Sequence, residues 1–326
     1  MKRPLRIKQR AGAKRGSLKY LRGIYDTRIA VIGSGFVGEA TGRGLAKHNN
    51  DITFIDVMRE KVAMLREEGF KSYLPEDYTK ITTDITMFCV PTPTVGGEIN
   101  LEYLLKATRQ FAERLRDYDG YHVAVIRSTV PPHTTREKVI PLIEKISGKK
   151  AGKEFGICMQ PEYLREVTAQ QDYARPWFIL IGEYDKKSGD ILERLYSKFD
   201  APIERTTLEE AEFQKYVHNV YNAVKIAFFN EMRIIAKGEN WNDAAIFQAT
   251  ARSCEGIWNP IYGLRDMGPF DGSCLPKDTR ALLQWGDNRG YGLEILRSVI
   301  SENLKHEETL GRNTNVRINY LGNISV

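Results

Sequence analysis

The stretch that decides the fold is Arg28-Ile-Ala-Val-Ile32, followed directly by Gly33-Ser-Gly-Phe-Val-Gly38. The first segment is a short apolar run rich in β-branched residues, which is typical of a buried strand. A helical pattern follows the glycines and runs to Lys47, and Asp51-Ile-Thr-Phe-Ile-Asp56 has the composition of a second strand. A strand, a glycine turn, a helix and a strand within about 30 residues predict a βαβ unit.

The glycine turn predicts a dinucleotide site, because its Gly33-x-Gly35-x-x-Gly38 spacing follows a strand and opens a helix. The first glycine makes the tight turn, the second lets the backbone approach a pyrophosphate, and the third lets helix and strand pack closely. The pyrophosphate would rest on the helix N-terminus. Asp56 ends the second strand, where a carboxylate binds both ribose hydroxyls and repels a 2′-phosphate. This favours NAD over NADP as the cofactor, against the alternative of a glycine turn with no ligand.

Strands and helices continue to alternate along the chain. Further strands are expected at Ile85–Val90, His122–Ile126, Gly156–Met159 and Phe178–Ile181, with helices between them at Leu101–Arg116, Thr134–Ile146 and Lys187–Lys198. Such alternation predicts an α/β fold, a Rossmann-like doubly wound parallel sheet with helices on both faces.

The strand pattern ends near residue 207, and an all-helical domain is expected beyond it. Leu208–Lys237 has the pattern of one long helix, with Thr207 as its N-cap. Shorter helices are expected at Asp243–Arg252, from Pro276 and from about Leu293. We therefore predict three parts: a tail at 1–27, an NAD-binding Rossmann domain at 28–205 and a helical domain at 206–326.

Composition narrows the class of protein. The 326 residues, 42% hydrophobic and 28% charged, are typical of a globular chain of two domains. The mean hydropathy is −0.41, and no apolar run approaches the roughly 18 residues of a membrane helix, so no membrane span is expected. Four cysteines without a CxxC pair argue against a disulfide scaffold and a structural zinc site. A cytoplasmic location and no metal are expected.

The net charge of +6 is concentrated at the start of the chain. Residues 1–28 hold ten Lys or Arg against the single acid Asp26, which leaves the remainder at about −3. A solvated, disordered arm is the simplest interpretation of this tail. Counterion-release binding to nucleic acid or to an acidic partner is the alternative, and nucleic-acid binding is expected through this tail alone.

Proline-rich segments follow three of the predicted strands. They read Val90-Pro-Thr-Pro93, Ser128-Thr-Val-Pro-Pro132 and Gln160-Pro-Glu162. In a doubly wound sheet, ligands bind outside the carboxyl ends of the strands, so the three segments should converge on the nicotinamide end of the cofactor. Taken singly, each segment is better explained as a proline-stiffened turn, and only the occurrence of all three favours a ligand site.

A cysteine stands at the predicted start of a helix in Phe270-Asp-Gly-Ser-Cys-Leu-Pro-Lys-Asp-Thr279. Pro276 suits a first helical turn, which places Cys274 at the N-terminal edge. The helix N-terminus and Lys277 favour the thiolate, the nucleophilic form, and Asp278 is close enough in sequence to orient or deprotonate a water. A small buried cysteine without a role is the alternative.

Lys215 and Asn219 are four residues apart on the predicted long helix and so share a face. Such a pair is usually solvated surface. It becomes functionally relevant only where that face points at the cofactor cleft.

Taken in order, these motifs resemble the UDP-glucose/GDP-mannose dehydrogenase family. They are GxGxxG, Val-Pro-Thr-Pro, Ser-Thr-Val-Pro-Pro, Pro-Glu-Tyr-Leu-Arg-Glu, Lys-x-x-x-Asn and Gly-Ser-Cys-Leu-Pro-Lys-Asp, between about residue 28 and about residue 305. The resemblance implies an NAD-dependent nucleotide-sugar 6-dehydrogenase that converts the primary alcohol of a UDP-glucose-like substrate to the uronic acid. It also implies two hydride transfers, with a cysteine thiohemiacetal and a thioester between them.

The resemblance also implies roles for individual residues. In catalysis these are Cys274 as nucleophile, Asp278 and Thr129 positioning a water, Glu162 as acid and base, and Lys215 with Asn219 at the oxyanion. On the cofactor side they are Gly33, Gly35, Phe36, Val37, Gly38, Asp56, Lys61, Thr92, Glu166 and Lys277. For the substrate they are Tyr163, Leu164, Arg165, Tyr262 and Gly272.

Family members dimerise through the long central helix, so a homodimer through residues 208–237 is implied, with 206–326 as the dimerisation and catalytic domain. Family members carry a further C-terminal domain that binds the substrate nucleotide. From the resemblance, we expect these 326 residues to lack that domain and a separate chain to be a possible source of it. Asp271 stands where the family has a second glycine, which puts a carboxylate near the expected sugar. The alternative function is a catalytically silent NAD-binding or scaffold homologue that has lost substrate binding.

Overall fold

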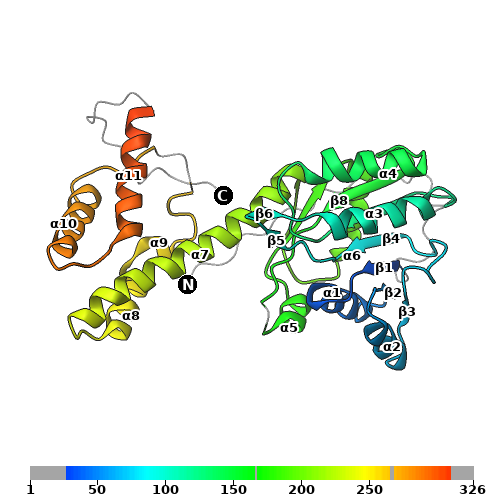
Figure 1. Cartoon of the computed structure of the whole chain (residues 1–326), viewed down its shortest axis with the longest axis horizontal. Coiled ribbons are helices and arrows are strands. Elements are labelled where there is room, and N and C mark those ends of the chain that lie inside the picture. Colours follow the sequence, from blue (N-terminus) through cyan, green and yellow to red (C-terminus); the bar gives the residue numbers. More distant parts are fainter. Residues whose placement is uncertain (1–26, 166, 265–267, 310–326) are drawn as a thin grey trace, which may run out of the picture. The chain divides into compact units, whose positions relative to one another are not determined.

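The structure, a computed structural model, describes residues 27–165, 167–264 and 268–309. Of the tail predicted at 1–27, residues 1–26 lie outside the described range. The chain divides into two compact units, Met1–Val217 and His218–Val326 (Figure 1). The division falls inside a helix, later than the predicted boundary at 205/206. Across the described residues, no helix has both the length and the apolar character needed to cross a membrane.

The first unit is built on an eight-stranded sheet with the order β10-β9-β8-β7-β4-β1-β2-β3. Its strands are β1 (Arg28–Ile32), β2 (Asp51–Ile55), β3 (Lys71–Tyr73), β4 (Ile85–Phe88), β7 (His122–Ile126), β8 (Phe155–Met159), β9 (Ile179–Glu183) and β10 (Ile203–Thr207). The pairing is parallel except between β8 and β9. The strand order runs outward from β1 in both directions, so the topological switch point lies between β1 and β4. The predicted doubly wound parallel sheet is confirmed.

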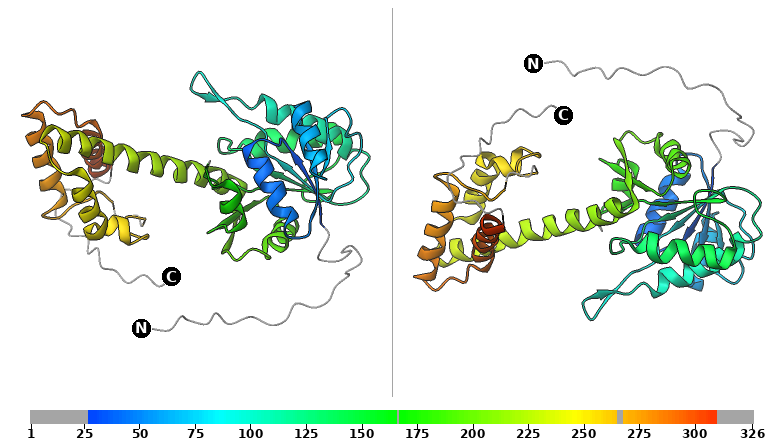
Figure 2. Two further views of the ribbon diagram at one scale, coloured as in Figure 1. Left: turned by 90° about the horizontal axis from the view of Figure 1, so that it is seen from below. Right: turned by 90° about the horizontal axis from the view of Figure 1, so that it is seen from above.

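Helices cover both faces of this sheet (Figures 1 and 2). They are α1 (Phe36–Ala46), α2 (Arg59–Glu67), α3 (Glu102–Leu115), α4 (Ile140–Ser147), α5 (Ala169–Ala174) and α6 (Lys186–Tyr196), with a π-helix at Thr135–Val139 that leads into α4. Alternate strand residues point to opposite faces. Accordingly, Ile126 packs in one apolar core with α3 and α4, and Val125 in a second core with α1, α2 and α6.

Several short elements were not predicted. They are β3, β10, α2, α5 and a hairpin of β5 (Thr94–Val95) with β6 (Glu98–Ile99), which projects from the first unit in Figure 2. β3 and β10 are the two edge strands, and their sequences, Lys-Ser-Tyr and Ile-Glu-Arg-Thr-Thr, lack an apolar run. Charged and short edge strands are common because an exposed edge otherwise pairs with other chains.

The long helix α7 (Leu208–Gly238) begins at a capping box, as predicted at Thr207. The Thr207 hydroxyl accepts a hydrogen bond from Glu210 N at 3.3 Å, and the Glu210 carboxylate accepts one from Thr207 N at 2.9 Å. Two backbone N–H groups at the helix start are thereby satisfied. α7 carries the chain from the first unit into the second.

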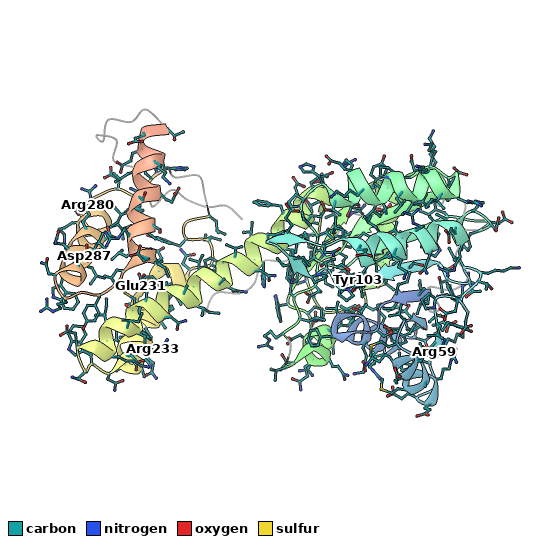
Figure 3. All side chains as sticks on the ribbon, viewed as in Figure 1. Arg59, Tyr103, Glu231, Arg233, Arg280 and Asp287 are labelled. Carbon is teal, nitrogen blue, oxygen red and sulfur yellow. The ribbon has the colours of Figure 1, made fainter. Side chains whose placement is uncertain are left out.

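The second unit is helical, with α8 (Asp243–Ser253), α9 (Glu255–Trp258), α10 (Leu275–Asp287) and α11 (Glu294–Thr309) following α7. Its small core contains Ile235, Leu293 and Leu296. The buried Glu231 of α7, labelled in Figure 3, accepts hydrogen bonds from the backbone N of Ile295 and of Leu296. A carboxylate at a helix N-terminus is favourable, so this contact fixes the start of α11 on α7. The helical domain predicted after the sheet is confirmed.

Candidate active site

The three glycines of the turn after β1 differ in their surroundings. Gly33 has a φ of +88°, and a Cβ there would lie 2.8 Å from Cys89 O. A Cβ on Gly38 would lie 1.8 Å from Gly33 O, which leaves no room for any side chain. Gly35, the N-cap of α1, has nothing within 4 Å of its Cβ position. The open space is at the glycine whose backbone would face a pyrophosphate, so the turn fits the phosphates of NAD.

Asp56 is fixed beside this turn. It directly follows β2 and is 9% exposed. Its Oδ2 accepts a hydrogen bond from Ser34 N at 2.5 Å and its Oδ1 accepts one from Met58 N at 2.9 Å. A carboxylate offers about four acceptor positions, so two remain for the hydroxyls of a ribose. This geometry fits the NAD interpretation of Asp56.

Lys61 of α2 pairs with a carboxylate of α1 rather than standing free. Its Nζ forms a short contact with Glu39, whose other oxygen accepts from Arg43 Nε at 2.8 Å. Burial alone would raise the pKa of Glu39, but the hydrogen bonds from Lys61 and Arg43 outweigh it and hold this pKa below its usual value. Of the other predicted cofactor residues on α1, Phe36 is exposed and Val37 packs against the core.

The segments after β4, β7 and β8 lie side by side. Thr92 Oγ1 donates a hydrogen bond to Thr129 O at 2.7 Å, and Ser128 Oγ donates one to Val90 O at 2.6 Å. Gln160 N donates to the last residue of β7 at 2.9 Å. Polar groups from three neighbouring strand ends therefore meet at the carboxyl edge of the sheet, where ligands bind in this fold.

A buried ion pair joins this edge to α7. Lys215 is 5% exposed, and its Nζ donates to Glu162 Oε1 at 3.0 Å and to Glu162 O at 2.5 Å. Glu162 Oε2 accepts from Leu164 N at 2.7 Å, so both carboxylate oxygens are engaged. Charged groups tolerate burial when they are paired and hydrogen-bonded in this way. The structure thus brings together Glu162 and Lys215, for both of which the family resemblance implies a catalytic role.

Arg127 was not identified from the sequence, although it immediately precedes Ser128 and Thr129. It is 3% exposed, and its Nη1 donates to Tyr196 Oη at 3.3 Å. Tyr196 Oη in turn donates to Gln160 Oε1 at 2.8 Å. Burial by itself would lower the pKa of Arg127, but the neighbouring tyrosines, Cys89 and Glu162 raise it by more. The net pKa lies above the usual value, so the guanidinium stays a cation. A single sequence does not show that an arginine is buried behind the strand ends, so the motifs gave no reason to select Arg127.

The predicted substrate segment after Glu162 is tied down by hydrogen bonds. Tyr163 Oη donates to Gln214 Oε1 at 2.5 Å, and Arg165 Nη2 pairs with Asp172 Oδ1 at 2.6 Å. Hydrogen bonds from Arg165 hold the pKa of Asp172 well below its usual range. A pocket lies under this segment, lined by Arg127, Gln160, Glu162, Tyr163, Leu164, Tyr173, Trp177 and Tyr196, among others. Glu166 lies outside the described residues.

In the second unit, Cys274 is the N-cap of α10 and is exposed, with Pro276 in the first turn as expected. Asp278 N donates to Cys274 O at 2.9 Å, and Lys277 Nζ forms a short ion pair with the Asp278 carboxylate. That hydrogen bond raises the pKa of Lys277 above its usual value. The thiol, the ammonium and the carboxylate therefore share one helical turn.

Three further predicted residues, Asn219, Tyr262 and Gly272, do not take part in the contacts given above for the described residues. Asn219 is exposed on α7, one turn after Lys215. Tyr262 is 41% exposed, and Gly272 is exposed with a φ of +90°.

Comparison with known proteins matches both units of the chain. Residues 27–200 match the NAD binding domain of the UDP-glucose/GDP-mannose dehydrogenase family, and residues 209–305 match its central domain. The GDP-mannose 6-dehydrogenase of Pseudomonas syringae pv. tomato is 35% identical over 297 residues, 85% of this chain and 68% of that protein. The UDP-glucose 6-dehydrogenase AglM of Haloferax volcanii is 30% identical, over 84% of this chain and 69% of that protein.

The structural comparison agrees. A crystal structure of a ternary complex of GDP-mannose dehydrogenase from Pseudomonas aeruginosa superposes with a TM-score of 0.81 and 32% identity, over 88% of this chain and 72% of that chain. A UDP-glucose dehydrogenase from Pyrobaculum islandicum gives a TM-score of 0.66 and 29% identity, over 89% of this chain and 73% of that chain. The chain belongs to the UDP-glucose/GDP-mannose dehydrogenase family and carries its NAD-binding domain, with NAD as the cofactor, and its central domain.

Proposed function

We propose that the chain oxidises the primary alcohol of a nucleotide sugar to the uronic acid, with Cys274 as the covalent nucleophile. The observation that carries the proposal is the exposed thiol at the first turn of α10, with Asp278 in the same turn. Family membership supports it, because the matched relatives are named as dehydrogenases of nucleotide sugars.

The first oxidation removes a hydride and a proton from the alcohol carbon and hydroxyl. NAD, when bound, accepts the hydride. The carboxylate of Glu162 is the proposed base for the hydroxyl proton, and the Lys215 ammonium beside it stabilises the charge that develops on the oxygen. Asn219, one turn along α7, is the proposed second donor to that oxygen. The product is the aldehyde.

The second oxidation requires a nucleophile, because an aldehyde has no hydroxyl from which to repeat the first step. The sulfur of Cys274 forms a bond to the aldehyde carbon, and the carbonyl oxygen takes a proton to give a thiohemiacetal. Loss of a second hydride and the hydroxyl proton gives a thioester. A water positioned by Asp278 and Thr129 then breaks the C–S bond and releases the acid and the thiol. One alcohol, one water and two NAD+ thus yield one acid, two NADH and two protons.

The other cofactor and substrate contacts are proposed from family resemblance. The NAD contacts proposed are the glycine turn, Phe36, Val37, Asp56, Lys61, Thr92, Glu166 and Lys277, within a domain at 28–205. The substrate contacts proposed are Tyr163, Leu164, Arg165, Tyr262 and Gly272. Lys61 is already paired with Glu39, and Arg165 with Asp172. Each of these two cations would therefore contact a ligand while it remains paired with its carboxylate.

The function is tested by incubating the protein with NAD and a panel of nucleotide sugars. GDP-mannose leads the panel, since relatives named for it reach 37% identity against 30% for those named for UDP-glucose. We expect two NADH per acid, measured by absorbance and by product mass. NAD binding without NADH from any sugar would instead support the catalytically silent homologue.

We propose that the protein works in a reducing compartment such as the cytoplasm. All four of its cysteines are free, and Cys254 and Cys274 are exposed. Exposed, unpaired thiols persist where glutathione and thioredoxin keep them reduced.

We also propose a homodimer formed through residues 208–237. The part of α7 beyond the first unit exposes apolar side chains: Val220 (55%), Tyr221 (57%), Val224 (52%), Ile226 (63%) and Ile234 (54%). A run of this kind marks a protein interface rather than a solvated helix.

Replacing Val224 with aspartate should convert the dimer to a monomer, because a buried, unpaired carboxylate opposes the association. Light scattering after gel filtration measures the mass. The control is Val95→Asp, which changes an apolar side chain of similar exposure (61%) on the β5–β6 hairpin and should leave the mass unchanged. A Val224→Asp protein with the wild-type mass would contradict an interface at this helix.

A further inference from the structure

One side chain of α11 holds the segment that leads to the thiol. Asn303 Oδ1 accepts a hydrogen bond from Phe270 N at 2.7 Å, and Asn303 Nδ2 donates one to Phe270 O at 3.0 Å. Both backbone polar groups of Phe270 are therefore paired with one carboxamide, as they would be with a neighbouring strand. A side-chain amide offers one acceptor and one donor at the separation this pairing needs, whereas an ionised carboxylate of the same shape offers acceptors alone.

The clamped residue is close to Cys274 in the chain. Residues 271–273 alone separate Phe270 from the N-cap of α10, so the chain between the two points spans at most about 14 Å. Gly272 within this stretch has a φ of +90°, and residues 272–274 are exposed. The other described residues leave much of the surface of 272–274 uncovered, and the clamp and the helix start fix the two ends of the segment.

The clamp is also attached to the packed core of the second unit. Asn303 lies on α11, whose start is held by Glu231, and α11 packs with α10 through the core of Leu293 and Leu296. The same Asn303 Nδ2 donates a further hydrogen bond to Glu307 Oε1 at 3.1 Å. Glu307 thus binds the same amide, while the two backbone hydrogen bonds of Phe270 go to Asn303, which makes Glu307 a matched control.

We propose that Asn303 is a positioning residue for the second oxidation: by clamping Phe270 it holds the segment 270–274 so that the thiol meets the aldehyde. This inference rests on the proposed function. The first oxidation is assigned to Glu162 and Lys215 and needs no thiol. Loss of the clamp should therefore separate the two steps, which a general loss of folding would not do.

The test compares Asn303→Ala with Glu307→Ala. Asn303→Ala should lower the rate of acid formation at least tenfold, keep the first hydride transfer within threefold of wild type, and release aldehyde that hydroxylamine traps as an oxime. Glu307→Ala should give two NADH per acid, as wild type does. Equal loss of both oxidations in Asn303→Ala, or acid formed at the wild-type rate, overturns the proposal. If Asn303→Ala does not fold, Asn303→Asp serves, since it keeps the acceptor for Phe270 N and loses the donor.

A second readout does not depend on turnover. Hydrogen exchange of the Phe270 amide should accelerate at least tenfold in the Asn303 variant and not in Glu307→Ala. Alkylation of Cys274 by iodoacetamide, measured in a Cys254→Ser background, should change more than threefold in the first variant alone. Unchanged exchange and alkylation overturn the clamp. Should wild type itself form no NADH, the proposed function fails while these two measurements still decide whether Asn303 holds the thiol segment.

Discussion

Replacing Cys274 with alanine is expected to lower acid formation by about 1000-fold, which corresponds to about 4 kcal/mol of lost transition-state stabilisation. The reason is chemical: without the sulfur, the aldehyde forms neither the thiohemiacetal that donates the second hydride nor the thioester that water cleaves. The first oxidation uses Glu162 and Lys215 and should continue. The expected result is one NADH per sugar consumed and an aldehyde that hydroxylamine traps.

The matched control is Cys254→Ser, because Cys254 is the other exposed thiol of the chain and lies between α8 and α9, outside the segment 270–274. It should retain two NADH per acid. Product mass, read after a single turnover with excess enzyme, separates the aldehyde oxime from the acid. Acid formed by Cys274→Ala at the wild-type rate would rule out covalent catalysis by this thiol.

The beginning of the fold could be predicted in detail because several independent signals coincide there. The apolar run 28–32, the glycine spacing and Asp56 all agree on one βαβ unit, and β1, α1 and β2 occur where they were expected. Edge strands lack this redundancy. β10 reads Ile203-Glu-Arg-Thr-Thr207, and Arg205 within it pairs with Glu183, Asp190 and Glu193 from neighbouring elements. These partners become neighbours only after the sheet has formed.

Sequence motifs predict the candidate site as a set of residues, but they do not predict the contacts between those residues. Glu162 and Lys215 are separated by 53 positions, and their pairing depends on where α7 meets the end of β8. The Asn303 clamp spans 33 positions and joins an irregular segment to a helix. Motif spacing identifies chemistry within one turn, as for Cys274 and Asp278, but contacts between distant elements follow from tertiary packing.

The glycine turn allows cofactor binding to be separated from folding by two single substitutions. Gly35 has a φ of −66° and a ψ of −167°, which alanine adopts without strain, and its Cβ position is empty to 4 Å. Gly35→Ala should therefore fold. Alanine lowers the entropy of the unfolded chain, but it is a poorer N-cap than glycine, and because these two effects oppose each other the stability should change by less than about 1 kcal/mol in either direction. Its methyl group occupies the space that the pyrophosphate needs. We expect its affinity for NAD to fall about 100-fold, or about 3 kcal/mol, by calorimetric titration.

Gly38→Ala should show the opposite result, namely a lower stability and an NAD affinity of the folded protein close to that of wild type. Its Cβ would lie 1.8 Å from Gly33 O, and this backbone atom moves only if α1 shifts away from β1. Overpacking of this kind costs about 1–3 kcal/mol or more, which lowers the melting temperature by about 2–4 °C per kcal/mol in a unit of this size. Thermal unfolding measures the loss of stability, and titration of the folded fraction with NAD measures the affinity for the cofactor. If Gly35→Ala binds NAD as tightly as wild type, the open space at Gly35 does not face the cofactor, because a ligand lying there could not accommodate the added methyl group.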